Sequence, residues 1–250
     1  MMNEVRTLDA NGAALAYRHR AGRGPLVVFL PGYMSDMTGS KATMLDGWAA
    51  STGRAFLRLD YSGCGASGGS FDAGSIGRWT ADTLAVIDAV TDGPVLLVGS
   101  SMGGWIALRV ALARPAQVAS LVGIAAAPDF TDWGLDLQDA DFLNLKAHGY
   151  IERPSEYGDG PYRYTETFIV DAEDQAVLGA EIAIDCPVRL LQGQCDDAVP
   201  WMTALDLAGW LRSPQVQVVL VKDGDHRLSR PADLALLTRT LDTLLLELAA

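Results

Sequence analysis

The stretch GSSMG at residues 99–103 carries the strongest chemical signal in this sequence of 250 residues. It fits G-x-S-x-G, a pattern in which a serine stands on a sharp turn between a strand and a helix and acts as a nucleophile. The apolar run PVLLV leads directly into Gly99, and the run MGGWIALRV follows the serine with no turn residue before Arg114. Small residues flank the serine, as a strained turn requires. We therefore predict a nucleophile elbow with Ser101 as the nucleophile.

A second match to the same pattern, GASGG at residues 65–69, fails this test. Residues 61–64 separate the motif of Ser67 from the preceding strand, and further glycines follow where a helix would have to begin. The overlapping G-x-G-x-x-G at residues 63–68 is equally unsuited to a dinucleotide. It does not open onto a helix, and no acidic residue ends a second strand about 20 residues later. We interpret YSGCGASGG as a flexible turn and expect no NAD site.

A serine hydroxyl becomes a good nucleophile when a base takes its proton and a carboxylate orients that base. The sequence has three histidines. His19 lies in an N-terminal hairpin and His148 in a polar insertion, so we expect surface roles for both. His226 follows the last strand in a loop that contains glycine, at the sheet edge to which Ser101 also points. By elimination and position, we assign His226 as the base.

The remaining groups of such a site have candidates in two loops. Asp196 and Asp197 both follow the run PVRLLQG, at the same edge of the sheet. The oxyanion that forms on the substrate needs two N–H donors. Met102, directly after the nucleophile, would supply one of them. The loop LPGYM would supply the other from the backbone of Tyr33, because Gly32 permits a close approach.

The elements that must position these residues follow a regular alternation. Short apolar runs alternate with segments of helical period, which is typical of a mostly parallel sheet with helices on both faces. The predicted strands are residues 25–31, 54–60, 94–100, 118–126, 187–193 and 216–221. Apolar side chains at helical spacing predict helices over residues 76–90 and 234–248. Asn11 and Gly12 predict a hairpin turn before the first of these strands. The fold class is therefore α/β.

One segment, residues about 129–183, breaks the alternation. A structureless loop of that length is improbable inside a compact domain, so we predict a single domain, residues 1–250, with a partly helical cap insertion. The insertion mixes apolar and aromatic side chains with cations (Phe130, Trp133, Phe142, Leu143, Tyr150, Tyr162, Tyr164 and Phe168; Lys146, Arg153 and Arg163). A cap over a serine nucleophile would enclose an acyl group, so we expect an apolar pocket that prefers medium or longer acyl chains.

Composition and charge narrow the possible partners. The formal net charge of −12 and the pI near 4.5 argue against nucleic acid or an anionic membrane, because both attract clustered Lys and Arg. No apolar run approaches the roughly 20 residues of a membrane span. Cys64, Cys186 and Cys195 lack CxxC spacing, and no metal-ligand set is visible, so we expect no disulfide framework, no metal and no cofactor. The N-terminus resembles neither a signal nor a transit peptide, which favours the cytoplasm. The sequence carries no signal for the oligomeric state.

With these residues in place, the chain resembles the α/β-hydrolase fold superfamily over nearly its whole length. Asp60, followed by Gly63 and Gly65, is similar to the D-x-x-G-x-G turn of that family. The family pattern G-x-x-D-x-x-V-P fits residues 193–200 and implies that the first of the two candidate acids, Asp196, is the one used. The chain order Ser, Asp, His is also that of the family.

A narrower resemblance points to one branch of this superfamily. The segments LPGYMSDMTGSKA, RLDYSGCGASGG, LLVGSSMGGW, DDAVPW and RPSEYGDG are similar to the mitochondrial palmitoyl-protein thioesterases that also cleave acyl glucuronides. The resemblance implies acyl ester or thioester substrates, and it suggests that the cap cations hold an anionic leaving group such as glucuronate. Because this chain lacks a transit peptide, the mitochondrial location does not carry over, and we expect a bacterial relative.

These inferences define a first hypothesis and its alternatives. We predict a serine hydrolase of esters or thioesters in which Ser101 is acylated, His226 shuttles the proton and Asp196 orients His226. Haloalkane hydrolases and most epoxide hydrolases of this fold use an aspartate nucleophile, so Ser101 argues against them. A carbon–carbon hydrolase or perhydrolase would use the same triad, and a non-catalytic small-molecule binding protein would keep the same fold.

Overall fold

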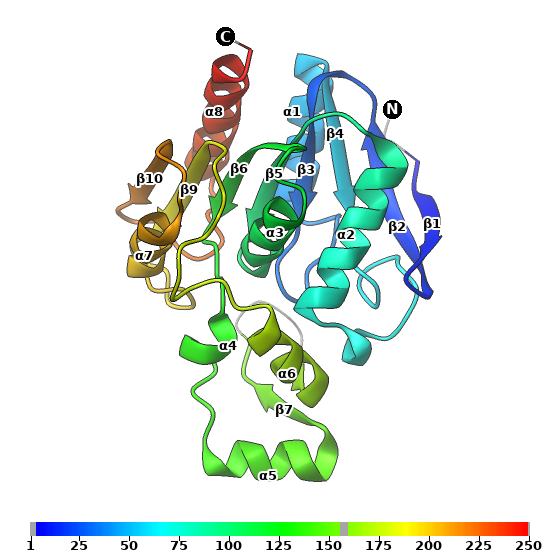
Figure 1. Ribbon diagram of the computed structural model, residues 1–250, viewed down its shortest axis with the longest axis vertical. Helices are drawn as coiled ribbons and strands as arrows, with labels where there is room; N and C mark the ends of the chain where they lie inside the picture. The colour runs from blue at the N-terminus through cyan, green and yellow to red at the C-terminus, as the bar shows by residue number, and fades with distance from the viewer. Residues whose placement is uncertain (1–3, 156–159, 250) are drawn as a thin grey trace.

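An eight-stranded sheet forms the centre of the molecule in the computed structural model, which describes residues 4–155 and 160–249 (Figure 1). Across the sheet the order is β1 (Arg6–Ala10), β2 (Ala13–Arg20), β4 (Arg54–Leu59), β3 (Arg23–Leu30), β5 (Val95–Ser100), β6 (Val118–Ile124), β9 (Val188–Gly193) and β10 (Val216–Val221). The strands from β4 to β10 are parallel to one another, and β2 is antiparallel to both β1 and β4. The six predicted strands are confirmed, with their ends within two residues of the predicted ones.

The hairpin of β1 and β2 turns at the two residues that the sequence indicated. Asn11 and Gly12 have φ angles of 52° and 76°, both in the left-handed region that a two-residue hairpin turn uses. The side chain of Asn11 donates to Asp82 at 3.0 Å, which fastens the turn to the helix beside it. The hairpin therefore extends the parallel sheet at one edge, far along the sheet from β9 and β10.

Helices cover both faces of the sheet, as the alternation predicted. The helices are α1 (Ser40–Thr52), α2 (Ile76–Val90), α3 (Met102–Ala113), α7 (Met202–Trp210) and α8 (Pro231–Glu247). Alternate side chains of each strand point to opposite faces. In β3, for example, Val28 and Leu30 belong to the apolar cluster that includes residues of α2, α3 and α7, whereas Val27 and Phe29 belong to the cluster that includes residues of α1 and α8. Figure 1 shows these two groups of helices on opposite faces of the sheet. None of the helices in the described part of the chain is long and apolar enough to cross a membrane.

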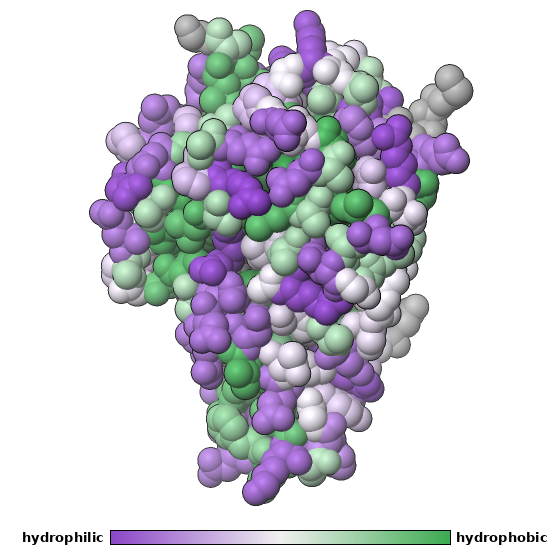
Figure 2. All heavy atoms as spheres, turned by 45° about the vertical axis from the view of Figure 1, so that its right-hand side comes forward, coloured by the Kyte–Doolittle hydropathy of each residue, from purple (hydrophilic) through white to green (hydrophobic). Residues whose placement is uncertain are grey.

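The segment predicted as a cap, residues 129–183, leaves the sheet after β6 and returns to it at β9. It contains α4 (Phe130–Trp133), α5 (Asp139–His148), β7 (Tyr150–Arg153), β8 (Tyr162–Thr165) and α6 (Glu166–Asp174). The pairing of β7 with β8 is antiparallel and was not predicted. Residues 156–159 of the motif RPSEYGDG lie outside the described residues. Figures 1 and 2 show the cap segment as a narrower part below the broad core, with hydrophobic and hydrophilic side chains mixed on its surface.

A buried carboxylate joins the two ends of the cap segment. Asp129 lies directly before α4 and is only 4% exposed. Its oxygens accept hydrogen bonds from the backbone N–H of Val177, at 2.9 and 3.0 Å, and from that of Leu178, at 2.6 Å. These donors come about 48 residues later in the chain, where the cap segment returns to the core. Asp129 therefore fixes the neck from which the cap projects.

The segment YSGCGASGG, predicted as a flexible turn, is a turn that several hydrogen bonds hold in place. The hydroxyl of Ser67 donates to the carbonyl of Asp60 at 2.7 Å and accepts from the N–H of Ala16 at 2.8 Å. The carboxylate of Asp60 accepts from the N–H of Met37, at 2.6 Å, and of Ala66, at 2.8 Å. A Cβ on Gly65 would lie 2.3 Å from that carboxylate, which explains the glycine. Ser67 thus has a structural role in joining β2 to the turn.

Candidate active site

Ser101 stands at the end of β5, on the turn into α3. Its backbone has φ 55° and ψ −122°, a conformation that L-residues rarely adopt. The turn is tightly packed, because a Cβ on Gly99 would lie 2.2 Å from the carbonyl oxygen of Gly103. A Cβ on Gly103 would in turn meet the carbonyl of Leu30 at 2.2 Å. The two glycines of the motif are therefore required by backbone contacts, and the strained serine is held from both sides.

His226 lies between Ser101 and Asp196 in a chain of hydrogen bonds. Its Nε2 is 3.2 Å from Ser101 Oγ, and its Nδ1 is 2.9 Å from Asp196 Oδ2. An imidazole whose Nδ1–H donates to a carboxylate has Nε2 free to accept the serine proton. The structure therefore brings the three side chains together with the connectivity that general-base activation of a serine requires.

The carboxylate of Asp196 is completely buried behind the histidine. Its Oδ1 accepts from the N–H of Ala198 at 3.0 Å and of Val199 at 2.8 Å, and its Oδ2 accepts from Gln192 Nε2 at 2.9 Å. Burial by itself would raise the pKa of Asp196, but the hydrogen bond and charge of His226 and these further donors outweigh burial and lower the pKa. Asp196 is therefore held as an anion, and the neighbouring Asp197 is exposed instead.

Backbone contacts place the Asp196 loop directly beside the His226 loop. A Cβ on Gly193 would lie 2.3 Å from the carbonyl oxygen of Gly224, so the two chains touch at that point. The N–H of Cys195 donates to the same carbonyl at 2.9 Å. Asp196 and His226 are 30 residues apart in the sequence. Main-chain contacts hold their loops side by side at the ends of two adjacent parallel strands, β9 and β10.

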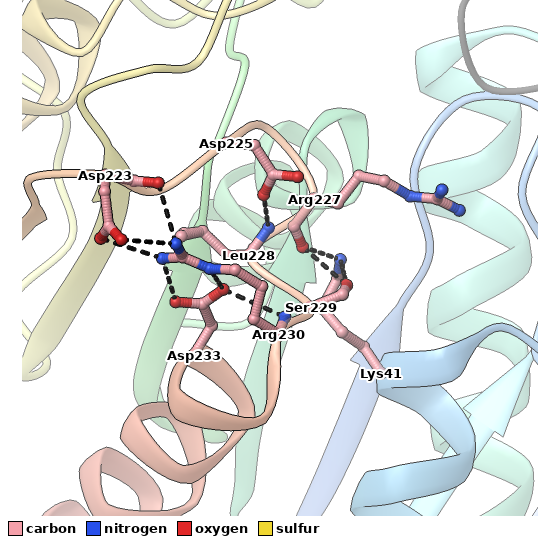
Figure 3. A network of polar contacts seen from close by, with 8 residues as sticks. All are labelled: Lys41, Asp223, Asp225, Arg227, Leu228, Ser229, Arg230 and Asp233. Carbon is pink, nitrogen blue, oxygen red and sulfur yellow. Dashed lines mark hydrogen bonds and ion pairs between the residues drawn. The ribbon is translucent and has the colours of Figure 1, made fainter.

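Two further groups of contacts fix the loop that carries His226 (Figure 3). Arg230 binds the carboxylates of Asp223 and Asp233 on either side of it, with N–O distances between 2.8 and 3.2 Å. From α1, Lys41 Nζ donates to the carbonyl of Arg227 at 2.5 Å and approaches Ser229 Oγ at 3.3 Å. Burial, and then the charge of Arg227, lower the pKa of Lys41 to about 8.

The loop after β3 passes beside the nucleophile. A Cβ on Gly32 would lie 3.3 Å from the carbonyl oxygen of Ser100 and 3.4 Å from Ser101 Cβ, so this loop lies close to the turn that carries Ser101. The next residue, Tyr33, borders the same cavity as Ser101 and Met102. Tyr61 supports this loop from below through a hydrogen bond from its hydroxyl to the carbonyl of Pro31 at 3.2 Å. The two residues predicted to donate to an oxyanion, Tyr33 and Met102, thus border the same cavity as Ser101.

A cavity of about 580 Å³ opens at Ser101 and His226. This volume lies in the range of small-molecule sites. Aromatic and aliphatic residues of the cap segment line one part of it (Phe130, Trp133, Leu135, Tyr162 and Tyr164), whereas polar residues of α1 and the His226 loop line another (Ser40, Lys41, Arg227 and Ser229). Asp36 and Asp197 also border it. The cavity therefore combines an apolar wall with a polar wall that carries both signs of charge.

Only some of the cap residues that were predicted to serve the pocket border this cavity. Of the three cap cations, Arg153 lines it, and its guanidinium binds Asp141 at 2.7 and 2.9 Å. Lys146 is exposed, and Arg163 forms ion pairs with Asp72 and Glu152 at the surface. Phe142 and Leu143, also predicted to serve the pocket or the core, are exposed at 55% and 68%.

The cavity cations of the core, Lys41 and Arg227, were not predicted. Their positions in the sequence could have indicated them: Lys41 lies in the first turn of the helix after the LPGYM loop, and Arg227 directly follows His226. The other two histidines lie elsewhere: His19 is half-buried in β2, where burial and then the charge of Arg6 lower its pKa, and His148 is exposed at the end of α5. Among the described residues, no group of three or more His, Cys, Asp and Glu could hold a metal ion.

None of the three thiols is placed to act as a nucleophile in this cavity. Cys64 and Cys186 are free and largely removed from water, and burial raises their pKa values to about 12 and about 11. Cys195 is free and exposed, and its Sγ lies 3.5 Å from the carbonyl of Lys222. A thiol with a raised pKa is a poor nucleophile. The thiols therefore offer no alternative to Ser101 as the candidate nucleophile.

Comparisons with known proteins agree with this fold. The model of the alpha/beta hydrolase family matches residues 27–244, and the chain belongs to that family. The superfamily predicted from the sequence is thereby confirmed, and the protein is a hydrolase.

The relatives found also agree with the narrower resemblance. The chain is 41% identical over 239 residues to the mouse protein named "Palmitoyl-protein thioesterase ABHD10, mitochondrial", covering 94% of this chain and 80% of that one. The human protein of the same name is 40% identical over 241 residues, covering 94% and 78%.

Solved structures show the same similarity to hydrolases of this family. A putative hydrolase from Agrobacterium vitis S4 is 40% identical and superimposes with a TM-score of 0.92 over 97% of this chain and 98% of that one. Mouse alpha/beta hydrolase domain-containing protein 10 is also 40% identical, with a TM-score of 0.91 over 98% and 99%. Est1E from Butyrivibrio proteoclasticus with ferulic acid bound, 20% identical with a TM-score of 0.80 over 98% and 99%, shares the fold.

Proposed function

We propose that this protein is a serine hydrolase of carboxylic esters and thioesters that works through an acyl-enzyme. The observation that carries the proposal is the hydrogen-bonded chain from Ser101 through His226 to the buried Asp196. The strained backbone of Ser101 and its position at the floor of a cavity support the role of nucleophile. The relatives that are named palmitoyl-protein thioesterases support the choice of esters and thioesters.

The reaction proceeds in two halves. Ser101 Oγ attacks the acyl carbon while its proton passes to His226 Nε2, and the carbonyl electrons move to an oxyanion that the N–H groups of Tyr33 and Met102 stabilise. The tetrahedral intermediate collapses, the C–O or C–S bond breaks, and His226 returns the proton to the leaving oxygen or sulfur. Water then attacks the acyl-enzyme, giving its proton to His226, and the second collapse releases the acid and returns the proton to Ser101. Asp196 stays ionised throughout and stabilises the imidazolium.

The apolar wall of the cavity supports acyl chains longer than acetyl as substrates. Phe130, Trp133 and Leu135 line it. Each methylene of the acyl chain that is also buried in the transition state stabilises that state by up to about 0.8 kcal/mol. We therefore propose that kcat/KM rises from acetyl to medium or longer chains. Acyl glucuronides are a second candidate substrate, favoured by the cations Lys41 and Arg227 on the polar wall.

Labelling with a fluorophosphonate probe tests the mechanism most directly. The folded protein should be labelled at Ser101, and the Ser101→Ala variant should not be labelled. Ser100→Ala is the matched control, since it alters the adjacent serine at the end of β5 and should leave labelling intact. Absence of labelling in the folded wild type would favour the binding-protein alternative over the enzyme.

A substrate panel tests the specificity. We propose p-nitrophenyl esters from C2 to C16, the matching acyl thioesters, and acyl glucuronides, each measured as kcat/KM. A steady fall from acetyl onward would reject the apolar acyl site. A labelled Ser101 without hydrolysis of any member would favour a carbon–carbon hydrolase or perhydrolase. The predicted cytoplasmic location and the absence of a nucleic-acid partner stay predictions from the sequence.

A further inference from the structure

We propose that the side chain of Tyr33 is a positioning residue that couples the cap segment to the oxyanion hole. The inference rests on the proposed function, in which the backbone N–H of Tyr33 is an oxyanion donor. It assigns to the phenol of the same residue a second role, which is to set the position of that donor from the cap. The cap would then contribute to the rate of the chemical step, in addition to enclosing the acyl group.

The ring of Tyr33 is the centre of an aromatic cluster. It stacks on Tyr164 of β8 with centroids 4.8 Å apart and an angle of 19° between the planes. Its other ring neighbours, at centroid distances from 5.2 to 6.2 Å, come from the cap segment (Phe130, Tyr162 and Phe168) and from the core (Phe71 and Trp79). Edge-to-face and offset contacts of this kind stabilise an aromatic cluster beyond the effect of burial. Four of the six neighbouring rings belong to the cap segment, so Tyr33 is fastened mainly to the cap.

The phenol adds a polar connection to the same part of the cap. The hydroxyl of Tyr33 donates a hydrogen bond to the backbone carbonyl of Arg163 in β8, 130 residues later in the chain. Burial, followed by the proximity of Tyr164, raises the pKa of Tyr33, so the hydroxyl stays protonated and continues to donate at any working pH. Ring packing and the hydrogen bond therefore hold Tyr33 to one cap strand from two directions.

The backbone of Tyr33 is bound to the nucleophile side at the same time. Gly32, directly before it, lies so close to Ser101 that an added Cβ would be 3.4 Å from Ser101 Cβ. Met34, directly after it, has φ 53°, so the backbone on this side is strained for a residue with a side chain. A displacement of the Tyr33 ring would move its own N–H, which is only a few bonds away. Misplacement of a catalytic group by about 1 Å can cost about 10²-fold in rate, so a cap that holds the ring also holds the donor.

A short substrate separates this coupling from simple acyl binding. We propose to measure p-nitrophenyl acetate hydrolysis by the wild type, Tyr33→Phe and Tyr164→Leu. Tyr33→Phe keeps the ring and the backbone N–H and removes only the hydrogen bond to the cap. Tyr164→Leu removes the stacked ring from the cap side and leaves the oxyanion loop unchanged. Phe142→Leu is the matched control, because Phe142 is an exposed cap aromatic in α5.

If the inference is correct, Tyr33→Phe and Tyr164→Leu lower kcat for the acetyl ester by roughly tenfold to a hundredfold, with KM within about twofold of the wild type. The rate of phosphonylation by the fluorophosphonate probe should fall by the same factor, because the phosphonyl oxygen occupies the same hole. Phe142→Leu should match the wild type in both assays. Thermal melts show which variants are folded. If Tyr33→Phe does not fold, Tyr164→Leu alone tests the inference.

Other outcomes overturn the inference in a recognisable way. The variants could be folded, keep the wild-type kcat for the acetyl ester and show only a higher KM for long-chain esters. That result would show that the cluster merely shapes the acyl pocket. A wild type that hydrolyses none of the esters and resists the probe would instead overturn the proposed function. The two failures are therefore distinguishable.

Discussion

Replacing Ser101 by glycine should stabilise the protein relative to replacing it by alanine. Ser101 has φ 55° and ψ −122°, in a region that residues with a Cβ avoid. Such a backbone costs about 1–3 kcal/mol. Ser101→Ala keeps the Cβ and hence the strain, whereas Ser101→Gly relieves it. Both variants lose the hydroxyl and its contact with His226, so that loss cancels in the comparison.

The expected magnitude is the difference between two opposing effects. Strain relief favours glycine by about 1–3 kcal/mol. The greater freedom of glycine in the unfolded chain opposes it by about 0.5–1 kcal/mol. The net expectation is that Ser101→Gly has a free energy of unfolding about 1 kcal/mol higher than that of Ser101→Ala. For a chain of this size, that corresponds to a melting temperature higher by about 2–4 °C.

Urea unfolding followed by circular dichroism measures this difference, and the preceding serine supplies the control. Ser100 is the last residue of β5, and its φ is not in the left-handed region. There Ser100→Gly should be less stable than Ser100→Ala by about 0.5–1 kcal/mol. The reasoning is refuted if glycine is also the less stable replacement at residue 101. Neither variant of Ser101 should hydrolyse esters at a measurable fraction of the rate of the wild type.

Three further predictions follow from the site and the neck of the cap. Asp196→Asn should lower kcat by several orders of magnitude because in the proposed mechanism Asp196 orients and stabilises the His226 imidazolium, whereas Asp197→Asn, at an exposed carboxylate, should change kcat by less than about tenfold; steady-state kinetics with one ester measures both. The Lys41 ammonium titrates near pH 8 in the folded protein and near 10.4 in the unfolded chain, so between these values the unfolded state binds more protons and stability rises with pH. Urea unfolding should therefore show the wild type gaining up to about 2 kcal/mol relative to Lys41→Met between pH 8 and 9.5. Asp129→Ala leaves the N–H groups of Val177 and Leu178 without their carboxylate and should cost about 2–5 kcal/mol, first seen as faster hydrogen exchange in residues 130–178.

Each of these predictions has a result that contradicts it. If Asp197→Asn were the damaging change, the assignment of the acid would be wrong. A difference between the wild type and Lys41→Met that stays constant from pH 8 to 9.5 would mean that Lys41 titrates as an ordinary lysine. If Asp129→Ala accelerated exchange uniformly over the chain, Asp129 would serve the core rather than the neck of the cap.

The parallel sheet was predictable because its signals are local. Each central strand is a short apolar run, and a strand buried on both faces needs no partner to be recognised in the sequence. The run before Gly99 is an example, since every residue of β5 is buried. The elbow was predictable for a related reason. A Cβ on Gly99 or on Gly103 would lie 2.2 Å from a backbone oxygen, so each position admits only glycine.

The hairpin of β7 and β8 was not predictable in the same way. Its strands are four residues each, YIER and YRYT, and both combine charged with aromatic side chains. Neither run is apolar enough to indicate a strand, because the pairing is stabilised by cross-strand contacts. The guanidinium of Arg163, for example, lies 4.2 Å from the ring centre of Tyr150 on the partner strand. Contacts of this kind exist only once the tertiary structure has formed.

The contrast between the two ends of the cavity has a physical origin. Ser101, Asp196 and His226 lie at the ends of strands whose loops contact one another at glycines. Their positions therefore depend on glycines that no residue with a Cβ can replace without a clash. The acyl end is built from ring packing around Tyr33, in which several aromatic or aliphatic residues would fill similar space. Motif residues therefore indicate which chemical groups the site can offer, but not which bond it breaks. The substrate depends on packing that a sequence can vary while keeping the fold, and it has to be found by measuring which acyl groups the cavity of this chain accepts.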